Sequence, residues 1–140
     1  MPVHKTFAIL GTVLGLALPV AALQSAMTEQ DYRKAMTEIQ WLVGDANQHI
    51  DSGYWPDVQE DMDKITRQFN AVEQFWTARE TTAAVAFAQS AIKATEPILV
   101  AASQMDGQAA RTALRGLQVT CQGCHEQFRE ETADGFRIKQ

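Results

Sequence analysis

The chain has 140 residues, of which 46% are apolar, and its 17 acidic against 12 basic side chains give a net charge of −5. This length suits a single domain, and the acidic balance argues against nucleic acid and anionic membrane surfaces as partners. Alanine supplies much of the apolar share, and β-branched runs bounded by turn residues are few, so the composition predicts an all-α fold.

Residues 1–22 have the organisation of a secretory signal peptide. A weakly basic start precedes an uncharged apolar run, residues 7–20, and small residues follow it. We expect cleavage after Ala22, with Ala26 as a second candidate site. The alternative is an uncleaved anchor, although the run is shorter than the span of about 20 residues that a membrane helix needs. Either outcome exports residues 23–140, which we expect to fold as one domain in the periplasm.

Two helices with matching apolar stripes are predicted in the first half of this domain. The first runs from Thr28 to Ile50, and Thr28 and Asp31 have the spacing of a capping box. The second starts at Trp55-Pro56, since proline is tolerated in a first helical turn. Apolar side chains recur at alternating intervals of four and three, as in helix bundles: Tyr32, Met36, Ile39, Val43, Ala46 and Ile50 in the first helix, and Val58, Met62, Ile65, Phe69, Val72 and Trp76 in the second.

The third predicted helix begins near Glu80 or Thr81 and extends toward Met105. Pro97 lies inside its pattern, and an internal proline removes one backbone hydrogen bond. We therefore expect a kink or break near residues 95–96. Its buried side is expected to hold Val85, Ala88, Ile92, Thr95, Leu99 and Ala102.

The fourth predicted helix follows a turn at residues 106–107 and ends around Glu131. In the short tail after it we expect a turn at residues 134–135, with Phe136 and Ile138 folding back onto the domain. Four helices with short connectors predict an up-down-up-down four-helix bundle. The inward side of the last helix is expected to hold Ala110, Leu114, Leu117, Cys121, Cys124 and Phe128.

The only two cysteines of the chain stand in the stretch VTCQGCHEQFREE, residues 119–131. Cys121 and Cys124 continue the inward side of the fourth helix. His125 follows Cys121 by four residues, so all three side chains are expected on nearly the same face. Cys-x-x-Cys-His is the attachment motif of c-type haem, in which two thiols bind the haem vinyl groups and the imidazole binds the iron. The sequence therefore favours one covalently attached haem c near the C-terminus.

Three other chemistries of this motif find less support. A thioredoxin-like redox pair needs a βαβ context, and no strands are predicted. A structural disulfide between adjacent helical turns closes a very small loop and would stabilise the protein little. A structural zinc ion needs four ligands, whereas His49 is the only further histidine in residues 23–140.

With these features the chain resembles the class II c-type cytochromes, the cytochrome c′ group. That group combines a four-helix bundle with a haem motif close to the C-terminus, and here CQGCH is followed by EQFRE, which holds an aromatic and then a basic residue. The resemblance implies that Cys121 and Cys124 hold the haem by thioethers and that His125 is the proximal axial ligand. It also implies that Arg129 lies near the haem edge or a propionate.

The resemblance further implies that the first helix covers the distal side of the haem. The segment DYRKAM makes Arg33 a candidate cofactor-binding residue and Met36 a candidate axial ligand, three residues apart where the family usually has four. If Met36 binds the iron, the haem is six-coordinate and low-spin, as suits electron transfer. If Met36 or Ile39 only packs over the iron, the site is five-coordinate and can bind small gases. A third outcome is bis-histidine ligation by His49.

Three functions follow as hypotheses. The first is a periplasmic electron-transfer cytochrome without enzymatic activity, because the carboxylates of the second helix, Asp61 among them, are expected on solvated faces rather than beside the haem. The second is a high-spin protein that binds NO or CO. The third is a haem-free helical adaptor with a Cys121–Cys124 disulfide. The expected partners are redox proteins, a small gas or a second copy of the chain. Trp41 and Leu42 lie beside the stripe of the first helix and could form the contact with a second copy.

Overall fold

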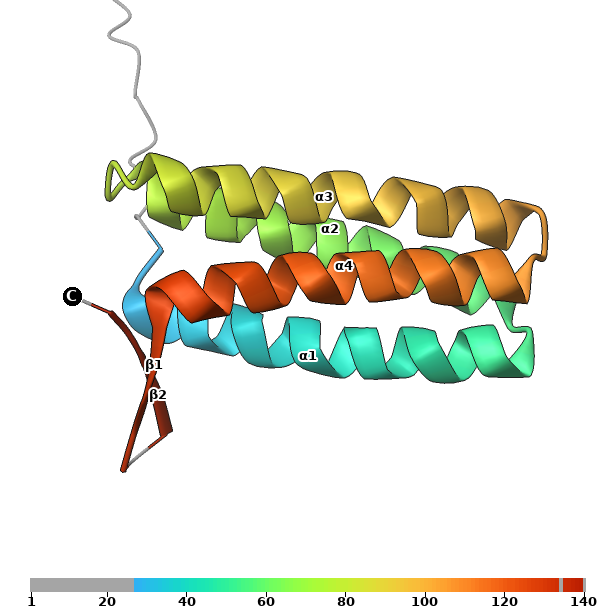
Figure 1. Cartoon of the computed structure of the whole chain (residues 1–140), viewed down its shortest axis with the longest axis horizontal. Coiled ribbons are helices and arrows are strands. Elements are labelled where there is room, and N and C mark those ends of the chain that lie inside the picture. The colour runs from blue at the N-terminus through green and yellow to red at the C-terminus, as the bar shows by residue number, and fades with distance from the viewer. Residues whose placement is uncertain (1–26, 134, 140) are drawn as a thin grey trace, which may run out of the picture.

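The computed structural model describes residues 27–133 and 135–139 of the chain. In this part of the chain, four helices lie side by side and consecutive helices run in opposite directions (Figure 1). The predicted four-helix bundle is therefore confirmed, whereas the predicted signal peptide lies outside the described residues. The elements are α1 (Glu29–Ser52), α2 (Trp55–Thr77), α3 (Thr82–Ser103) and α4 (Gly107–Phe128), followed by the strands β1 (Arg129–Thr132) and β2 (Gly135–Ile138).

The helix ends follow from local residue chemistry. Thr28 caps α1, since its Oγ1 accepts the Asp31 N–H at 3.1 Å while the Asp31 carboxylate accepts the Thr28 N–H at 3.3 Å. Gly53 ends α1 in the left-handed region at φ 73°, which glycine adopts without the strain of a Cβ. Pro56 occupies the first turn of α2, where its missing N–H costs no hydrogen bond. The predicted capping box and the start of α2 are thus confirmed.

The predicted break near residues 95–96 is wrong, because α3 runs through Pro97 without interruption. α3 packs closely against α2 on one side and α4 on the other. Thr95 is buried, donates its hydroxyl hydrogen bond to the Ile92 carbonyl at 2.7 Å, and lies 3.3 Å from the Thr66 hydroxyl of α2. Packing on both sides therefore holds the segment helical in spite of the proline.

The C-terminal tail forms a hairpin that the all-α prediction missed. α4 ends at Phe128 rather than near Glu131, because Arg129 takes an extended conformation (φ −118°, ψ 134°) and begins β1. The hairpin pairs Arg129 with Ile138 and closes at Thr132 and Gly135. Ile138 packs against the core, as predicted. Phe136 remains 49% exposed and instead lies under the Arg129 guanidinium. The predicted turn residue Asp134 lies outside the described residues.

The core confirms the predicted stripe of α2 completely, while α1 buries a wider face and α3 a shifted one. α4 buries the first three residues of its predicted inward row and leaves the other three partly exposed. α1 buries Ala35 and Leu42, whereas Met36 and Val43 are only partly buried. A helix that faces two neighbours buries more than one row of side chains. Leu42 is therefore part of the core rather than of a dimer surface, while Trp41 is 69% exposed. In α3 the shift of one residue replaces three predicted core positions by Ala84, Ala91 and Ile98.

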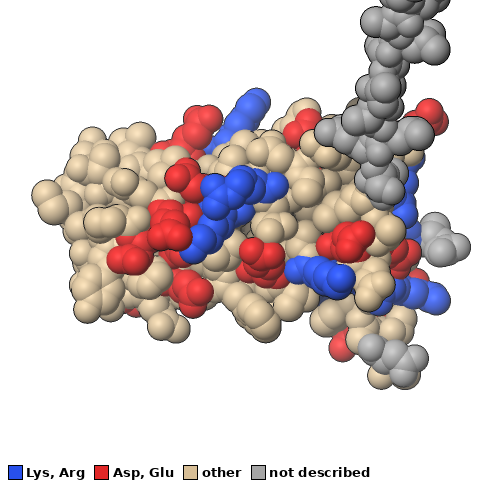
Figure 2. All heavy atoms as spheres, turned by 180° about the vertical axis from the view of Figure 1, so that it is seen from behind, with Lys and Arg blue, Asp and Glu red and all other residues tan. Residues whose placement is uncertain are grey.

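The surface mixes charges of both signs. On the face shown in Figure 2, acidic and basic side chains lie interspersed rather than in a patch of one sign. Pairs such as Lys64–Glu60 at 2.7 Å join oppositely charged residues one helical turn apart. Within the described residues, no helix has both the length and the apolar character of a membrane span.

A half-buried histidine–carboxylate pair lies at the end of the bundle where α1 meets α2. Asp61, predicted to be solvated, is only 4% exposed and accepts a 2.7 Å hydrogen bond from His49 Nδ1. That hydrogen bond raises the pKa of His49, and Asp57 and Asp45 add to the effect. Burial raises the pKa of the Asp61 carboxyl, which the bond from His49 opposes. The prediction for Asp61 is corrected because the space between α1 and α2 encloses it.

Replacing His49 by glutamine should weaken the pH dependence of stability near neutrality. Because the folded pKa of His49 is raised, its contribution is complete below the unfolded value of about 6.5 and is lost as pH rises through the folded pKa. We expect the thermal midpoint of the wild type to fall between about pH 6 and about pH 8. His49→Gln should lose most of that fall and cost about 1–3 kcal/mol at the lower pH. Identical pH profiles would contradict this expectation.

Candidate haem site

A cavity of about 620 Å³ opens between α1 and α4. These two helices are the least closely packed of the neighbouring pairs in the bundle. The volume lies within the range of about 300–1,000 Å³ that is typical of cofactor and ligand pockets. Its walls are mostly apolar and come from all four helices: Tyr32, Ile39 and Val43 of α1, Phe69 and Val72 of α2, Phe87 of α3 and Cys121 of α4.

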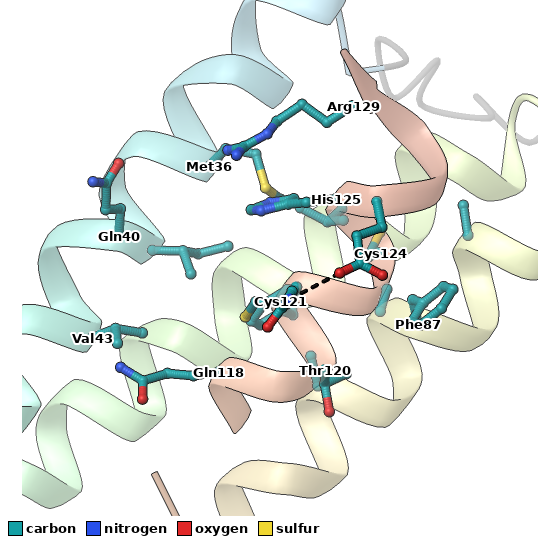
Figure 3. Close-up of a pocket in the computed structure, with 18 of the residues that line it drawn as sticks. Met36, Gln40, Val43, Phe87, Gln118, Thr120, Cys121, Cys124, His125 and Arg129 are labelled. Atoms are coloured by element: carbon teal, nitrogen blue, oxygen red, sulfur yellow. Dashed lines mark hydrogen bonds between the residues drawn. The ribbon is translucent and has the colours of Figure 1, made fainter. Parts of the chain in front are cut away.

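The cavity is lined by the three residues of the CQGCH motif that would attach a haem, Cys121, Cys124 and His125 (Figure 3). Leu117 is fully buried, and Cys121, one turn later, is the point where the inward row of α4 reaches the open space. Cys124 and His125 follow on the same side. The prediction that both thiols and the imidazole share one face of the last helix is therefore confirmed.

The protonation states of the motif follow from its partial burial. Burial raises the pKa of Cys121, and burial together with the neighbouring Cys121 raises the pKa of Cys124 to about 11. Both cysteines are free and are thus neutral thiols near pH 7. Burial lowers the pKa of His125, and the charge of Arg129 lowers it further. The imidazole is therefore neutral, which is the form that binds a metal ion.

Glycine at the centre of the motif lets an aromatic wall approach α4. A Cβ on Gly123 would lie 3.1 Å from Cε1 of Phe87, closer than ordinary van der Waals contact. Phe87 also meets Phe128 edge-on, with ring centroids 6.4 Å apart. Phe87 was not predicted as a site residue because it lies off the predicted stripe of α3. The packing of α3 against α4 brings it to the site.

Met36 of α1 stands across the cavity from the motif. Its side chain lines the same space and points toward the His125 ring (Figure 3). One turn earlier, Tyr32 stacks on Phe75 of α2 with centroids 4.4 Å apart, which anchors the start of α1. Burial raises the pKa of Tyr32 to about 12, so its hydroxyl stays protonated. The structure thus brings the predicted distal residue and the predicted proximal residue together.

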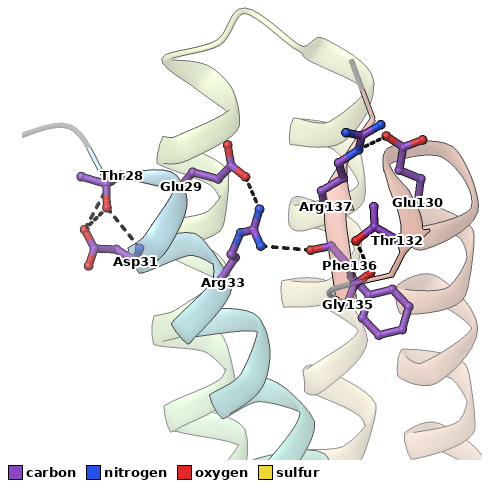
Figure 4. A network of polar contacts seen from close by, with 9 residues as sticks. All are labelled: Thr28, Glu29, Asp31, Arg33, Glu130, Thr132, Gly135, Phe136 and Arg137. Atoms are coloured by element: carbon purple, nitrogen blue, oxygen red, sulfur yellow. Dashed lines mark hydrogen bonds and ion pairs between the residues drawn. The ribbon is translucent and has the colours of Figure 1, made fainter.

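The two predicted arginines lie at the edge of this site. The Arg129 guanidinium lines the cavity and rests 4.0 Å from the centroid of the Phe136 ring. Arg33 lines an adjoining cavity of about 540 Å³, which shares Met36 and His125 with the first. Arg33 donates hydrogen bonds to Glu29 Oε1 at 2.7 Å and to the Phe136 carbonyl at 3.1 Å (Figure 4).

His49 does not belong to the site. It lines neither cavity and bonds Asp61 instead. Thirteen helical residues separate it from Met36, which amounts to about 20 Å along α1. Bis-histidine ligation through His49 is therefore inconsistent with the fold.

The residues at the cavity fit a haem. The group is a flat, largely apolar macrocycle with carboxylates at one edge and an iron that accepts imidazole and thioether ligands. Here an apolar cavity carries a neutral imidazole, a thioether and two thiols, with arginines at its edge. A four-helix bundle with this donor set is what a haem-binding c-type cytochrome requires.

The family follows from comparison with known proteins. The family model described as Cytochrome C' matches residues 16–129, which is most of the chain. The chain belongs to the cytochrome C′ family. Comparison with curated proteins and comparison with solved structures each gave no significant match.

Proposed function

We propose that the protein is a periplasmic electron-transfer cytochrome with no substrate chemistry of its own. Cys121 and Cys124 would hold one haem c by thioether bonds, His125 would be the proximal axial ligand and Met36 the distal one. The observation that carries the proposal is the opposition of His125 and Met36 across a cavity that both cysteines line. The haem supplies one-electron redox chemistry when bound.

The residues of the chain would tune that chemistry in three ways. The neutral His125 imidazole could bind the iron of the haem without first losing a proton. Apolar walls such as Phe69 and Phe87 exclude water, which affects the reduction potential of a haem. Arg129 and Arg33 place positive charge at the edge of the site, where carboxylates of the cofactor would be stabilised.

Export and partners form part of the same proposal. The layout of residues 1–22 supports secretion and a periplasmic location. An electron carrier needs redox partner proteins, and the excess of acidic side chains would favour partners with a basic surface. Trp41, which is 69% exposed on α1, would suit contact with a second copy of the chain.

A second candidate function is the binding of NO or CO by a five-coordinate iron. The adjoining cavity of about 540 Å³ favours it, because that space reaches both Met36 and His125 and could accept an exogenous ligand. A haem-free adaptor with a Cys121–Cys124 disulfide finds less support, since the matching family is that of cytochrome C′.

The visible spectrum of the purified ferrous protein, recorded with and without CO, tests the proposed function. A thioether-ligated iron should give a low-spin spectrum that CO leaves unchanged or alters only slowly. A high-spin spectrum with rapid CO uptake would instead establish the gas-binding alternative. The absence of any haem spectrum would contradict both.

A further inference from the structure

The C-terminal hairpin lies beyond the part of the chain that matches the family. The match ends at residue 129, where β1 begins. The hairpin nevertheless connects the two helices that flank the haem site. β1 continues directly from α4, and the Lys139 N–H donates to the Phe128 carbonyl at 2.9 Å. On the other side, Arg33 of α1 donates to the Phe136 carbonyl at 3.1 Å. The hairpin thus links α1 to α4 beside the cavity that separates them.

This link lies about one helical turn from the two candidate axial ligands, toward the end of the bundle where α1 begins and α4 ends. Arg33 precedes Met36 by about one turn of α1, and Arg129 follows His125 by about one turn of α4. Phe136 and Arg129 both line the two cavities, and the Arg129 guanidinium stacks on the Phe136 ring. They therefore lie at the boundary between the adjoining cavity and the space that faces the motif.

Few contacts hold the hairpin in this position. A two-stranded hairpin alone is at best marginally stable in water, so its placement depends on the bundle. Besides the two hydrogen bonds to α1 and α4, the hairpin has two further contacts with the bundle. Ile138 packs against the core, and Lys139 Nζ donates a hydrogen bond to the Glu126 carbonyl. Arg33 is itself oriented by its hydrogen bond to Glu29 (Figure 4). Loss of the Arg33 contact should therefore release the β2 side of the hairpin.

We propose that the hairpin, residues 129–133 and 135–139, is a strap that controls the access of exogenous ligands to the space between Met36 and His125. The proposal rests on the proposed haem at that site. With the strap in place, Phe136 and Arg129 narrow the passage from the adjoining cavity to the space between Met36 and His125. A diatomic gas therefore passes more readily than a bulkier ligand. Release of the strap removes this discrimination by size.

The test compares rates of ligand combination in variants that dissect the strap. Carbon monoxide and n-butyl isocyanide are mixed with the ferrous haem protein, and the change in absorbance is followed by stopped flow. Arg33→Met removes the link to α1, while Phe136→Ala removes the ring and keeps the carbonyl that Arg33 bonds. Arg111→Met is the matched control, because Arg111 joins the same two helices through Asp51 at 3.1 Å, at the other end of the bundle.

We expect Arg33→Met to combine with the isocyanide roughly threefold to tenfold faster than the wild type, the range that matches loss of a partly exposed hydrogen bond from a charged donor. Phe136→Ala should also combine faster than the wild type, because it lacks the ring that narrows the passage. The rate with carbon monoxide should change less, and Arg111→Met should behave as the wild type. The proposal would be overturned if both strap variants combined with the isocyanide at the wild-type rate. It would also be overturned if none of the proteins combined with the isocyanide.

Hydrogen exchange provides a readout that does not involve the iron. Arg33→Met should accelerate exchange of the β2 amides and leave those of α2 and α3 unchanged, whereas protection of β2 equal to that of the wild type would contradict the strap. Haem content, read by mass spectrometry, separates the two proposals. A wild-type protein without haem contradicts the proposed function and the access role with it, while haem-loaded variants with wild-type rates contradict the strap alone.

Discussion

Replacing both motif cysteines by serine should abolish covalent haem attachment. Serine cannot form the thioether bonds, so denaturing mass spectrometry of Cys121→Ser/Cys124→Ser should give the mass of the bare polypeptide. The wild type should carry the additional mass of one haem, which survives denaturation. The variant should also unfold at a lower temperature, because the cavity of about 620 Å³ between α1 and α4 loses the group proposed to fill it.

Three further proteins control this experiment. Each single serine variant leaves one thiol and should keep a haem held by one bond. Thr120→Ser changes another side chain of the cavity wall on the same stretch of α4 and should retain full haem content. A wild-type protein with the bare polypeptide mass, or a double variant that keeps covalent haem, would contradict the assigned roles of Cys121 and Cys124.

Met36→Leu should convert the haem iron from six-coordinate low-spin to five-coordinate high-spin. Leucine keeps the size and apolar character of the side chain but has no thioether to bind the iron. The variant should therefore take up CO rapidly, and its reduction potential should fall because thioether ligation raises the potential. Visible spectra in both redox states and a potentiometric titration measure the two effects.

Met62→Leu is the matched control for this substitution. Met62 is fully buried in α2 and lines neither cavity, so the same change there should leave the spin state as it is in the wild type. If the wild type is already high-spin and Met36→Leu leaves its spectrum unchanged, Met36 is not a ligand. The gas-binding function would then replace electron transfer.

Local sequence signals predicted the helices well. The capping box at Thr28 and the proline start at Pro56 lie where expected, because each acts on the few backbone groups beside it. The stripe of α2 was also predicted in full. Each of these features depends on residues within one or two helical turns.

The predictions for Pro97, Asp61 and the C-terminal tail failed because contacts with distant segments are not visible in the local sequence. Pro97 does not break α3, since α2 and α4 hold that segment from both sides. Asp61 is buried because α1 covers it and His49 bonds it. The hairpin after Phe128 was missed because its strands are only four residues long and are held partly by contacts to α1 and α4. In each case a distant segment outweighs the local preference.

The sequence alone predicted the helical bundle and the shared face of Cys121, Cys124 and His125, because the spacing of residues along one helix is a local property. What lies opposite that face depends on the tertiary structure. It places Met36 across the cavity, pairs His49 with Asp61, and brings the hairpin beside the site. These positions depend on how α1 packs against α2 and how far it lies from α4. Contacts between helices set both, whereas the period of one helix sets neither.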